Sequence, residues 1–237
     1  MNALGMRINP EVPTLVPLKT DGDITKSLKG MRAKASVSFC VNGKALHTEK
    51  GEIQFTAEGV SGIAVMQLSR LMRKNAGRAG LLIDFMPDFT YEELTVFLKA
   101  KAALMPQNTC ADFLNGVINK RIGQALVRRH APLSGNIGDI SAESIEKIAG
   151  ELKGFSLPVY GPLSWKYAQA ACGGADISGF DSKTLMISHL PGIFAAGEML
   201  DVDGPCGGFN LQWAWSSGLL AAKSALRYIN TNPPFIQ

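Results

Sequence analysis

The sequence lacks the features that mark several large classes of protein. None of its apolar runs approaches the roughly 18 residues that suggest a membrane-spanning helix. Its first 20 residues are too polar and too rich in proline for a secretory signal peptide. Lys and Arg exceed Asp and Glu by only 24 to 20 and are scattered along the chain, whereas nucleic-acid-binding proteins usually concentrate positive charge. We therefore expect no membrane partner and no nucleic-acid partner.

The chain is also poor in the residues that bind metals or form disulfides. It has four cysteines and three histidines, with no CxxC pair and no histidine at metal-ligand spacing. The histidines stand alone in the sequence, and no catalytic triad is visible. We therefore expect no metal site and a reduced, cytoplasmic protein, and we assign no catalytic residue. The widely spaced cysteines are Cys40, Cys110, Cys172 and Cys206.

The composition is that of an ordered globular protein. Hydrophobic residues make up 46% and charged residues 19% of the 237 positions, which is enough for one large or two small domains with a real core. After Phe155 glycine rises, charge falls, and short strands replace amphipathic helices. We predict an α+β or α/β fold divided near residues 155–160 into a mixed β and helical domain (1–155) and a second domain (156–237).

The first domain is predicted to combine a small sheet with several helices. Asn42 and Gly43 separate two runs of alternating apolar and polar residues, and the first run alternates at Val37, Phe39 and Val41, which indicates a β-hairpin. Thr90 and Ser141 are predicted to cap helices. The other elements expected here are a helix over 60–71, a buried strand over 79–87, and helices over 91–105, 109–131 and 142–153.

The second domain ends in a glycine-rich segment followed by a helix. Residues 191–226 read PGIFAAGEMLDVDGPCGGFNLQWAWSSGLLAAKSAL. Short strands are expected over 155–161, 168–176, 184–188 and 193–196, and a helix from Asn210 to about Tyr228. In open α/β sheets, ligands gather where strands end, and a helix N-terminus without a side-chain cap can hold a negative charge. A cofactor cradle would explain the glycines, the acids and the helix together, whereas a loop that merely reverses direction would explain the glycines alone.

The whole segment resembles the C-terminal flavin-binding signature of the BaiN-type family of NAD(P)/FAD-dependent oxidoreductases, which are conserved bacterial flavoproteins. GEIQFTAEGVSGIAVMQLSR at 51–70 and AACGGAD at 170–176 are similar to two further motifs of this family. The resemblance therefore extends over essentially the whole chain. It implies that the first domain is an insert that roofs the flavin ring, and that the second is the C-terminal part of a Rossmann-like FAD-binding domain.

The resemblance also implies which residues hold FAD. Gly197 and Glu198 would lie at the ribityl–phosphate part of the cofactor, although Glu198 could instead be a loop acid satisfied by its own protein. Asp201 would either contact the cofactor or cap backbone amides. Cys206 has no partner cysteine nearby and is interpreted as a packing residue. The residues implied to line the isoalloxazine ring are Gly207, Gly208, Phe209, Asn210 and Leu211.

One motif of the family is missing. Its members begin with a βαβ unit that carries GxGxxG and, about 20 residues later, an acid; together these hold the ADP half of FAD. No such unit occurs in this sequence. We therefore expect the chain to be truncated or to work beside an N-terminal FAD-binding half or in a homo-oligomer, and to bind FAD weakly or not at all by itself.

Two functions follow as alternatives. The first is a portion of a flavin-dependent oxidoreductase that moves hydride from NAD(P)H through FAD to an unsaturated or otherwise activated small molecule. The second is a non-catalytic fragment or subunit that binds protein and holds no flavin.

Overall fold

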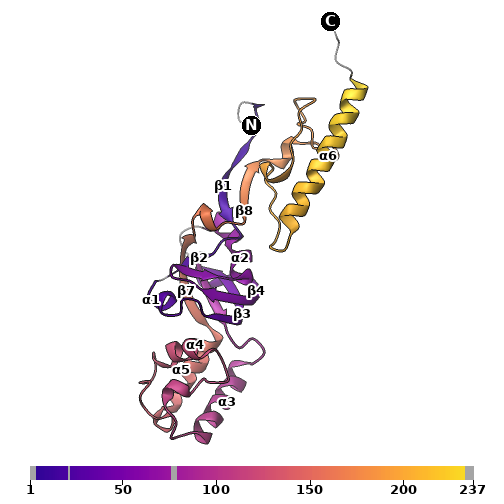
Figure 1. The fold of residues 1–237 in the computed structure, drawn as a ribbon. Helices are drawn as coiled ribbons and strands as arrows, with labels where there is room; N and C mark the ends of the chain where they lie inside the picture. The colour runs from indigo at the N-terminus through magenta and orange to yellow at the C-terminus, as the bar shows by residue number, and fades with distance from the viewer. Residues whose placement is uncertain (1–3, 21, 76–78, 233–237) are drawn as a thin grey trace. The chain divides into compact units, whose positions relative to one another are not determined.

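The computed structural model describes residues 4–20, 22–75 and 79–232 of a mixed α/β protein. Contacts within the chain group it into two compact units. Unit 1 comprises Met1–Val16 and Ser164–Gln237, and unit 2 comprises Pro17–Leu163. Their helices and strands are labelled in Figure 1. In the part of the chain that is described, no helix has the length and apolar character needed to span a bilayer.

Unit 2 is built around a closed barrel of six strands. The strands follow one another around the barrel in the order β2-β5-β4-β3-β6-β7, and every neighbouring pair is antiparallel. The last of them lies across the predicted boundary at 155–160. The strands are β2 (Leu18–Thr20), β3 (Arg32–Val41), β4 (Lys44–Phe55), β5 (Gly59–Ser61), β6 (Ala79–Asp84) and β7 (Phe155–Pro162).

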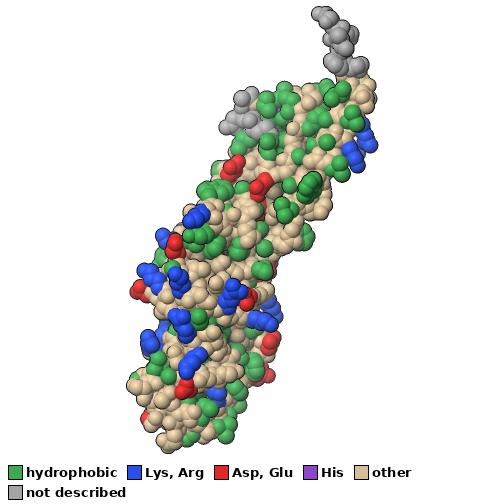
Figure 2. Space-filling model, in the orientation of Figure 1, with side chains coloured by type: hydrophobic (Ala, Val, Ile, Leu, Met, Phe, Trp, Pro, Cys, Tyr) green, Lys and Arg blue, Asp and Glu red, His purple; other side chains and the backbone are tan. Residues whose placement is uncertain are grey.

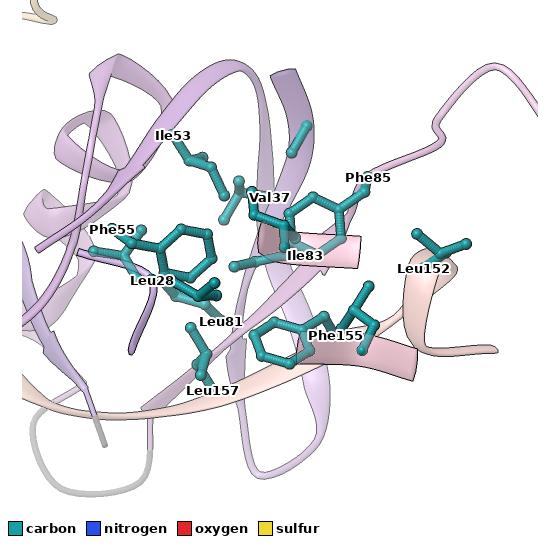
Figure 3. Packing of buried hydrophobic residues seen from close by; sticks show 14 of the residues in the cluster. Leu28, Val37, Ile53, Phe55, Leu81, Ile83, Phe85, Leu152, Phe155 and Leu157 are labelled. Atoms are coloured by element: carbon teal, nitrogen blue, oxygen red, sulfur yellow. The ribbon is translucent and has the colours of Figure 1, made fainter. Parts of the chain in front are cut away.

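The barrel interior follows from the alternating pattern of the sequence. Asn42 and Gly43 both have positive φ, of 50° and 77°, as the tight hairpin turn between β3 and β4 requires. The predicted hairpin is therefore confirmed. Val37, Phe39 and Ile53 are fully buried, and side chains from β3, β4, β6 and β7 converge in the core shown in Figure 3.

The motif at 51–70 closes one part of this barrel. β4 leads into β5, and α2 (Ile63–Ser69) then packs against β4. Gly62, which precedes α2, has a φ of 101°, and a Cβ atom there would lie 2.3 Å from the carbonyl oxygen of Glu52. A Cβ atom on Gly59 would lie 2.0 Å from the carbonyl oxygen of Leu18. Gly59 and Gly62 are thus required by close backbone contacts inside the barrel.

Three helices of unit 2 lie beyond the barrel in Figure 1: α3 (Tyr91–Leu104), α4 (Lys120–Val127) and α5 (Ala142–Lys153). The predicted caps are confirmed. The Thr90 side chain accepts a hydrogen bond from the Glu93 amide, and the Glu93 side chain accepts one from the Thr90 amide. The Ser141 side chain accepts a hydrogen bond from the Ser144 amide. A short helix, α1 (Gly22–Ser27), follows β2.

The continuous helix predicted over 109–131 is wrong. Only a 3-10 turn at Cys110–Asp112 and the helix α4 form there. Gly116 has a φ of 79°, which ends the first turn, and Asn119 starts α4 by accepting a hydrogen bond from the Arg121 amide. A glycine and a capping residue inside an apolar periodic run thus divided it.

Lys153, at the end of α5, ties this helix to the segment that follows β6. Its Nζ atom lies 2.7 Å from Asp84 Oδ2 and 2.8 Å from the carbonyl oxygen of Met86, and it also donates to the carbonyl oxygen of Phe89. The side chains of Lys153 and Asp84 are only 19% and 24% exposed. Removing the ammonium group would leave three acceptors without their donor in a partly buried place.

The described residues of unit 1 form one two-stranded antiparallel sheet and one long helix. The sheet pairs β1 (Ile8–Thr14) with β8 (Ala170–Ala175), so the strand expected over 168–176 is confirmed, with its first two residues outside β8. The helix is α6 (Phe209–Thr231), close to its predicted bounds. The strands expected over 184–188 and 193–196 are wrong, because isolated bridges alone (Phe180 with Ile187, Met186 with Phe194) form there.

Unit 2 begins and ends at adjacent positions. The Leu163 amide donates to the carbonyl oxygen of Pro17 at 2.9 Å, and β2 pairs with β7. In unit 1, Thr14 pairs with Ala170. The chain passes from one unit to the other after Val16 and after Leu163. In each unit, the segments next to these two positions are therefore neighbours.

We predict that Gly62→Ala lowers the free energy of unfolding by about 3 kcal/mol or more, because it adds both backbone strain and a clash with Glu52. Gly43→Ala is the matched control: its φ is also positive, but a Cβ atom there meets nothing within 4 Å, so about 1 kcal/mol is expected. Urea unfolding measures both. Equal losses would show that the Glu52 contact has no effect.

We also predict that Lys153→Met destabilises the protein by about 3 kcal/mol, since a partly buried carboxylate and two carbonyl groups lose a charged donor. Lys147→Met on the same helix removes an exposed pair with Glu143 and should cost at most about 0.5 kcal/mol. Urea denaturation of the two variants tests the contrast, which would be refuted by indistinguishable midpoints.

Candidate functional site

All the residues implied to hold FAD lie in unit 1, but they belong to two groups. Gly197, Gly207 and Gly208 lie next to α6 or directly before it. Glu198 and Asp201 instead contact β8. The structure thus brings the turn at 197 to the side of α6, while the two carboxylates are bound to the backbone of a strand.

The turn at Gly197 is held by two side chains of α6. The Gly197 amide donates to Ser217 Oγ at 2.9 Å, and Trp213 Nε1 donates to the Gly197 carbonyl oxygen at 3.1 Å. Ser217 is buried and in turn donates to the Trp213 carbonyl oxygen at 2.6 Å. Trp213 and Ser217 are four residues apart and therefore lie on one face of the helix. Neither of these two bonds was predicted from the sequence.

The two implied acids satisfy backbone and side-chain donors of the protein itself. Glu198 Oε1 accepts from the Ala171 amide at 2.8 Å. Asp201 Oδ1 accepts from the Gly173 amide at 3.0 Å, and its Oδ2 accepts from Asn9 Nδ2 at 2.8 Å. Asp201 thus caps a backbone amide, which is one of the two roles left open for it, and its contact with the cofactor stays a prediction.

A third acid caps the turn that follows β8. Asp176 accepts a hydrogen bond from the Ser178 amide at 2.9 Å. The hydrogen bonds from Ser178 are the main cause of a lowered pKa at Asp176, and the charge of Arg7, 3.7 Å away, adds a smaller effect in the same direction. Asp176 therefore keeps its negative charge at neutral pH.

The start of α6 is open. Gly208 takes the cap position with a φ of 92°, and no side chain caps the helix. Gly207 has a φ of 119°, and a Cβ atom on Gly208 would meet nothing within 4 Å. Since the first amides of a helix have no partner within it, this end presents backbone N–H groups and partial positive charge.

Asn210 shapes the loop before the helix. Its Oδ1 accepts from the Gly204 amide at 2.7 Å, and its Nδ2 donates to the Gly204 carbonyl oxygen at 3.1 Å. Its side chain is therefore committed to the loop, whereas Phe209 and Leu211 are exposed. Cys206 Sγ lies 3.6 Å from Gln169 Oε1, and none of the four cysteines forms a disulfide.

These features match the chemistry of a flavin edge in part. The open helix start and the two positive-φ glycines suit a planar, electron-rich group that needs close backbone approach. The carboxylates of Glu198 and Asp201 already have protein partners. In the described residues, no group of three His, Cys, Asp or Glu side chains is placed to hold a metal ion.

Comparison with known proteins decides the family. Residues 12–170 match the family described as the HI0933-like protein barrel and H2TH domain. The chain belongs to the HI0933-like family. Its six-stranded barrel and helices agree with that description, and the resemblance to BaiN-type flavoproteins is confirmed.

Curated relatives of this HI0933-like chain carry two kinds of name. It is 30% identical over 231 residues to a 3-dehydro-bile acid delta(4,6)-reductase of Clostridium scindens, a match that covers 94% of the chain and 56% of the relative. It is 26% and 29% identical to ribosomal RNA dihydrouridine synthases of Haemophilus influenzae and Escherichia coli, of which it covers 54% and 55%.

Two conclusions follow from these relatives. The family is one of FAD-dependent oxidoreductases, and the HI0933-like chain spans about half the length of the curated relatives it matches. Since two relatives are named for ribosomal RNA, the expected absence of a nucleic-acid partner stays an untested prediction.

Sequence reasoning also missed an ion pair in unit 2. His130 Nε2 lies 3.1 Å from Glu151 Oε1, and Arg129 lies 3.0 Å from Glu151 Oε2. Glu151 and His130 are 21 residues apart on different elements, so no local spacing could reveal this pair. Arg129 also lies over the ring of Phe155, and the group therefore joins the end of α4 to α5 and β7.

We predict that Ser217→Ala lowers the free energy of unfolding by about 1–2 kcal/mol, because the Gly197 amide loses its acceptor. Ser216→Ala removes an exposed hydroxyl that contacts Gln212. Both changes gain the same helix propensity, so their difference, read from thermal denaturation, isolates the bond to Gly197. If Ser216→Ala were equally destabilising, the bond to Gly197 would carry no stability.

Proposed function

We propose that this chain is the flavin-facing and substrate-binding portion of an FAD-dependent oxidoreductase. The proposed reaction moves hydride from NAD(P)H through FAD to an activated double bond of a small molecule. The observation that carries the proposal is the open start of α6, where Gly207 and Gly208 leave the first helical amides uncapped and accessible. In this proposal, unit 1 supplies the C-terminal part of a Rossmann-like FAD-binding domain.

FAD, when bound, would accept hydride from NAD(P)H and pass it on to the substrate. The chain's own residues would bind and polarise the cofactor. The amides of Phe209, Asn210 and Leu211 would stabilise negative charge at the pyrimidine edge of the ring. Gly207 and Gly208 would let this edge approach the backbone.

The neighbouring turn would support the ribityl–phosphate part of FAD. Trp213 and Ser217 fix both backbone polar groups of Gly197, so its position beside α6 is set before any ligand arrives. Glu198 and Asp201 would act chiefly by positioning this turn on β8, because their carboxylates accept from Ala171 and Gly173. A preformed site loses less entropy on binding.

The names of the relatives support a double bond as the acceptor. One relative is named as a delta(4,6)-reductase and two as dihydrouridine synthases, and reduction of an activated ring double bond suits both names. We propose a small-molecule substrate of this kind. The proposal also includes a cytoplasmic location, since the four cysteines form no disulfide.

The competing proposal is a non-catalytic subunit that binds protein without flavin. It is favoured by the apolar side chains that α6 exposes, among them Trp215 and Leu219. The two proposals differ in whether the chain contributes to flavin binding at all.

Flavin uptake separates these functions. The chain alone should retain little FAD after gel filtration, because most contacts to the adenine and pyrophosphate are expected outside it. A chimera in which this chain replaces the matched region of the Clostridium scindens relative should retain one FAD per chain and be reduced by NADH or NADPH. A folded chimera without flavin absorbance would refute the oxidoreductase proposal.

Charge reversal at the helix start tests the cradle. In the chimera, Phe209→Asp should weaken FAD binding at least about fivefold relative to Phe209→Asn, because the added carboxylate repels the electron-rich edge of the ring. An acid in the first turn stabilises the helix itself, so loss of fold would not explain the effect. Equal affinities of the Asp and Asn variants would place the flavin elsewhere.

A further inference from the structure

The amphipathic pattern of α6 is inverted. A surface helix normally buries its large apolar side chains and exposes polar ones. In α6 the buried residues are Ser217, Ala221 and Ser224, all of them small. Six large apolar side chains are more than half exposed, and five of them lie on one side of the helix: Leu211, Trp215, Leu219, Leu226 and Ile229. We call these five residues the α6 stripe.

The α6 stripe occupies one side of the helix. At 100° per residue its members fall within an arc of about 80° and extend over roughly 27 Å. Figure 2 shows hydrophobic side chains spread over the region where Figure 1 places α6. Ala214 and Gly218 make a shallow apolar depression of about 380 Å³ between Leu211, Trp215 and Leu219. A depression over small residues, bordered by large apolar side chains, can accommodate a side chain from another helix in knobs-into-holes packing.

Unit 1 has too little structure of its own to cover this stripe. Its sheet has two strands, and sheets of that size are marginally stable alone. Among the described residues, eight buried apolar side chains form its core, compared with thirty-three in unit 2. Unusually large contiguous apolar patches on the surface of a protein mark interaction sites.

We propose that the α6 stripe docks the polypeptide that corresponds to the part of the relatives outside the match. The length of the relatives points to this occupant, because the match includes 94% of this chain but only 56% of the reductase. The relatives therefore carry nearly as much polypeptide again, which is enough to add a layer over α6. This inference rests on the two-part arrangement of the proposed function but not on flavin binding.

Thiol labelling tests the coverage directly. Leu219→Cys is placed in the stripe, and Leu104→Cys, on the exposed side of α3, is the matched control because Leu104 is 84% exposed. The maleimide labelling rate at each position is read by peptide mass spectrometry, without added FAD. Position 219 should react at least tenfold more slowly in the chimera than in the chain alone, and position 104 equally in both.

Charge insertion provides a second readout. Leu219→Lys should be nearly neutral in the chain alone, where the side chain meets water, but should lower the melting temperature of the chimera by about 4 °C or more. Leu104→Lys should be neutral in both proteins. If the chimera does not fold, the same labels are read on this chain co-expressed with the unmatched part of the relative.

Two labelling results would overturn the proposal. Equal labelling at position 219 in both proteins means that this polypeptide does not cover α6. Slow labelling already in the chain alone means that residues 17–163 or a second copy covers it, and sedimentation distinguishes these two occupants. A chimera that protects position 219 but holds no flavin would leave the docking intact and refute only the proposed oxidoreductase function.

Discussion

The contact between α6 and the turn at Gly197 is the constraint on which the candidate site depends. Trp213 and Ser217 bind the two polar backbone groups of one residue, and this fixes the turn from which Glu198 reaches β8. Small residues on the inner side of the helix, such as Ala221, allow the close approach. These two bonds, one to a serine hydroxyl and one from an indole N–H, set both the distance and the rotation of α6 against the turn.

Glycines serve different physical purposes in the two units. Gly59 and Gly62 lie where a Cβ atom would collide with backbone carbonyl oxygens of the barrel, so they are required by packing. A Cβ atom on Gly208 would meet no atom within 4 Å, so packing does not explain why this position is a glycine. An unfilled glycine with positive φ at a helix start permits a ligand to approach, which is why this position carries the functional argument.

The parts of the fold that follow local rules could be predicted from the sequence. The Asn42–Gly43 hairpin and the caps at Thr90 and Ser141 were found because each depends on neighbouring residues. The break before α4 was missed because the helical spacing of apolar residues continues past Gly116, whose positive φ ends the preceding turn. The strand expected before Gly197 was wrong since its apolar residues pack without a partner strand. The bonds from Trp213 to Gly197 and from Asp201 to Gly173 join distant segments, and no spacing could have shown them.

The adjacent ends of unit 2 have an evolutionary meaning. The Leu163 amide donates to the Pro17 carbonyl oxygen, and β2 pairs with β7. The chain therefore enters and leaves unit 2 at two adjacent, paired strands. A module with such ends can be spliced into a surface connection of a host domain without stretching either one. Exchange of this module between relatives would therefore leave the backbone connections of unit 1 unchanged.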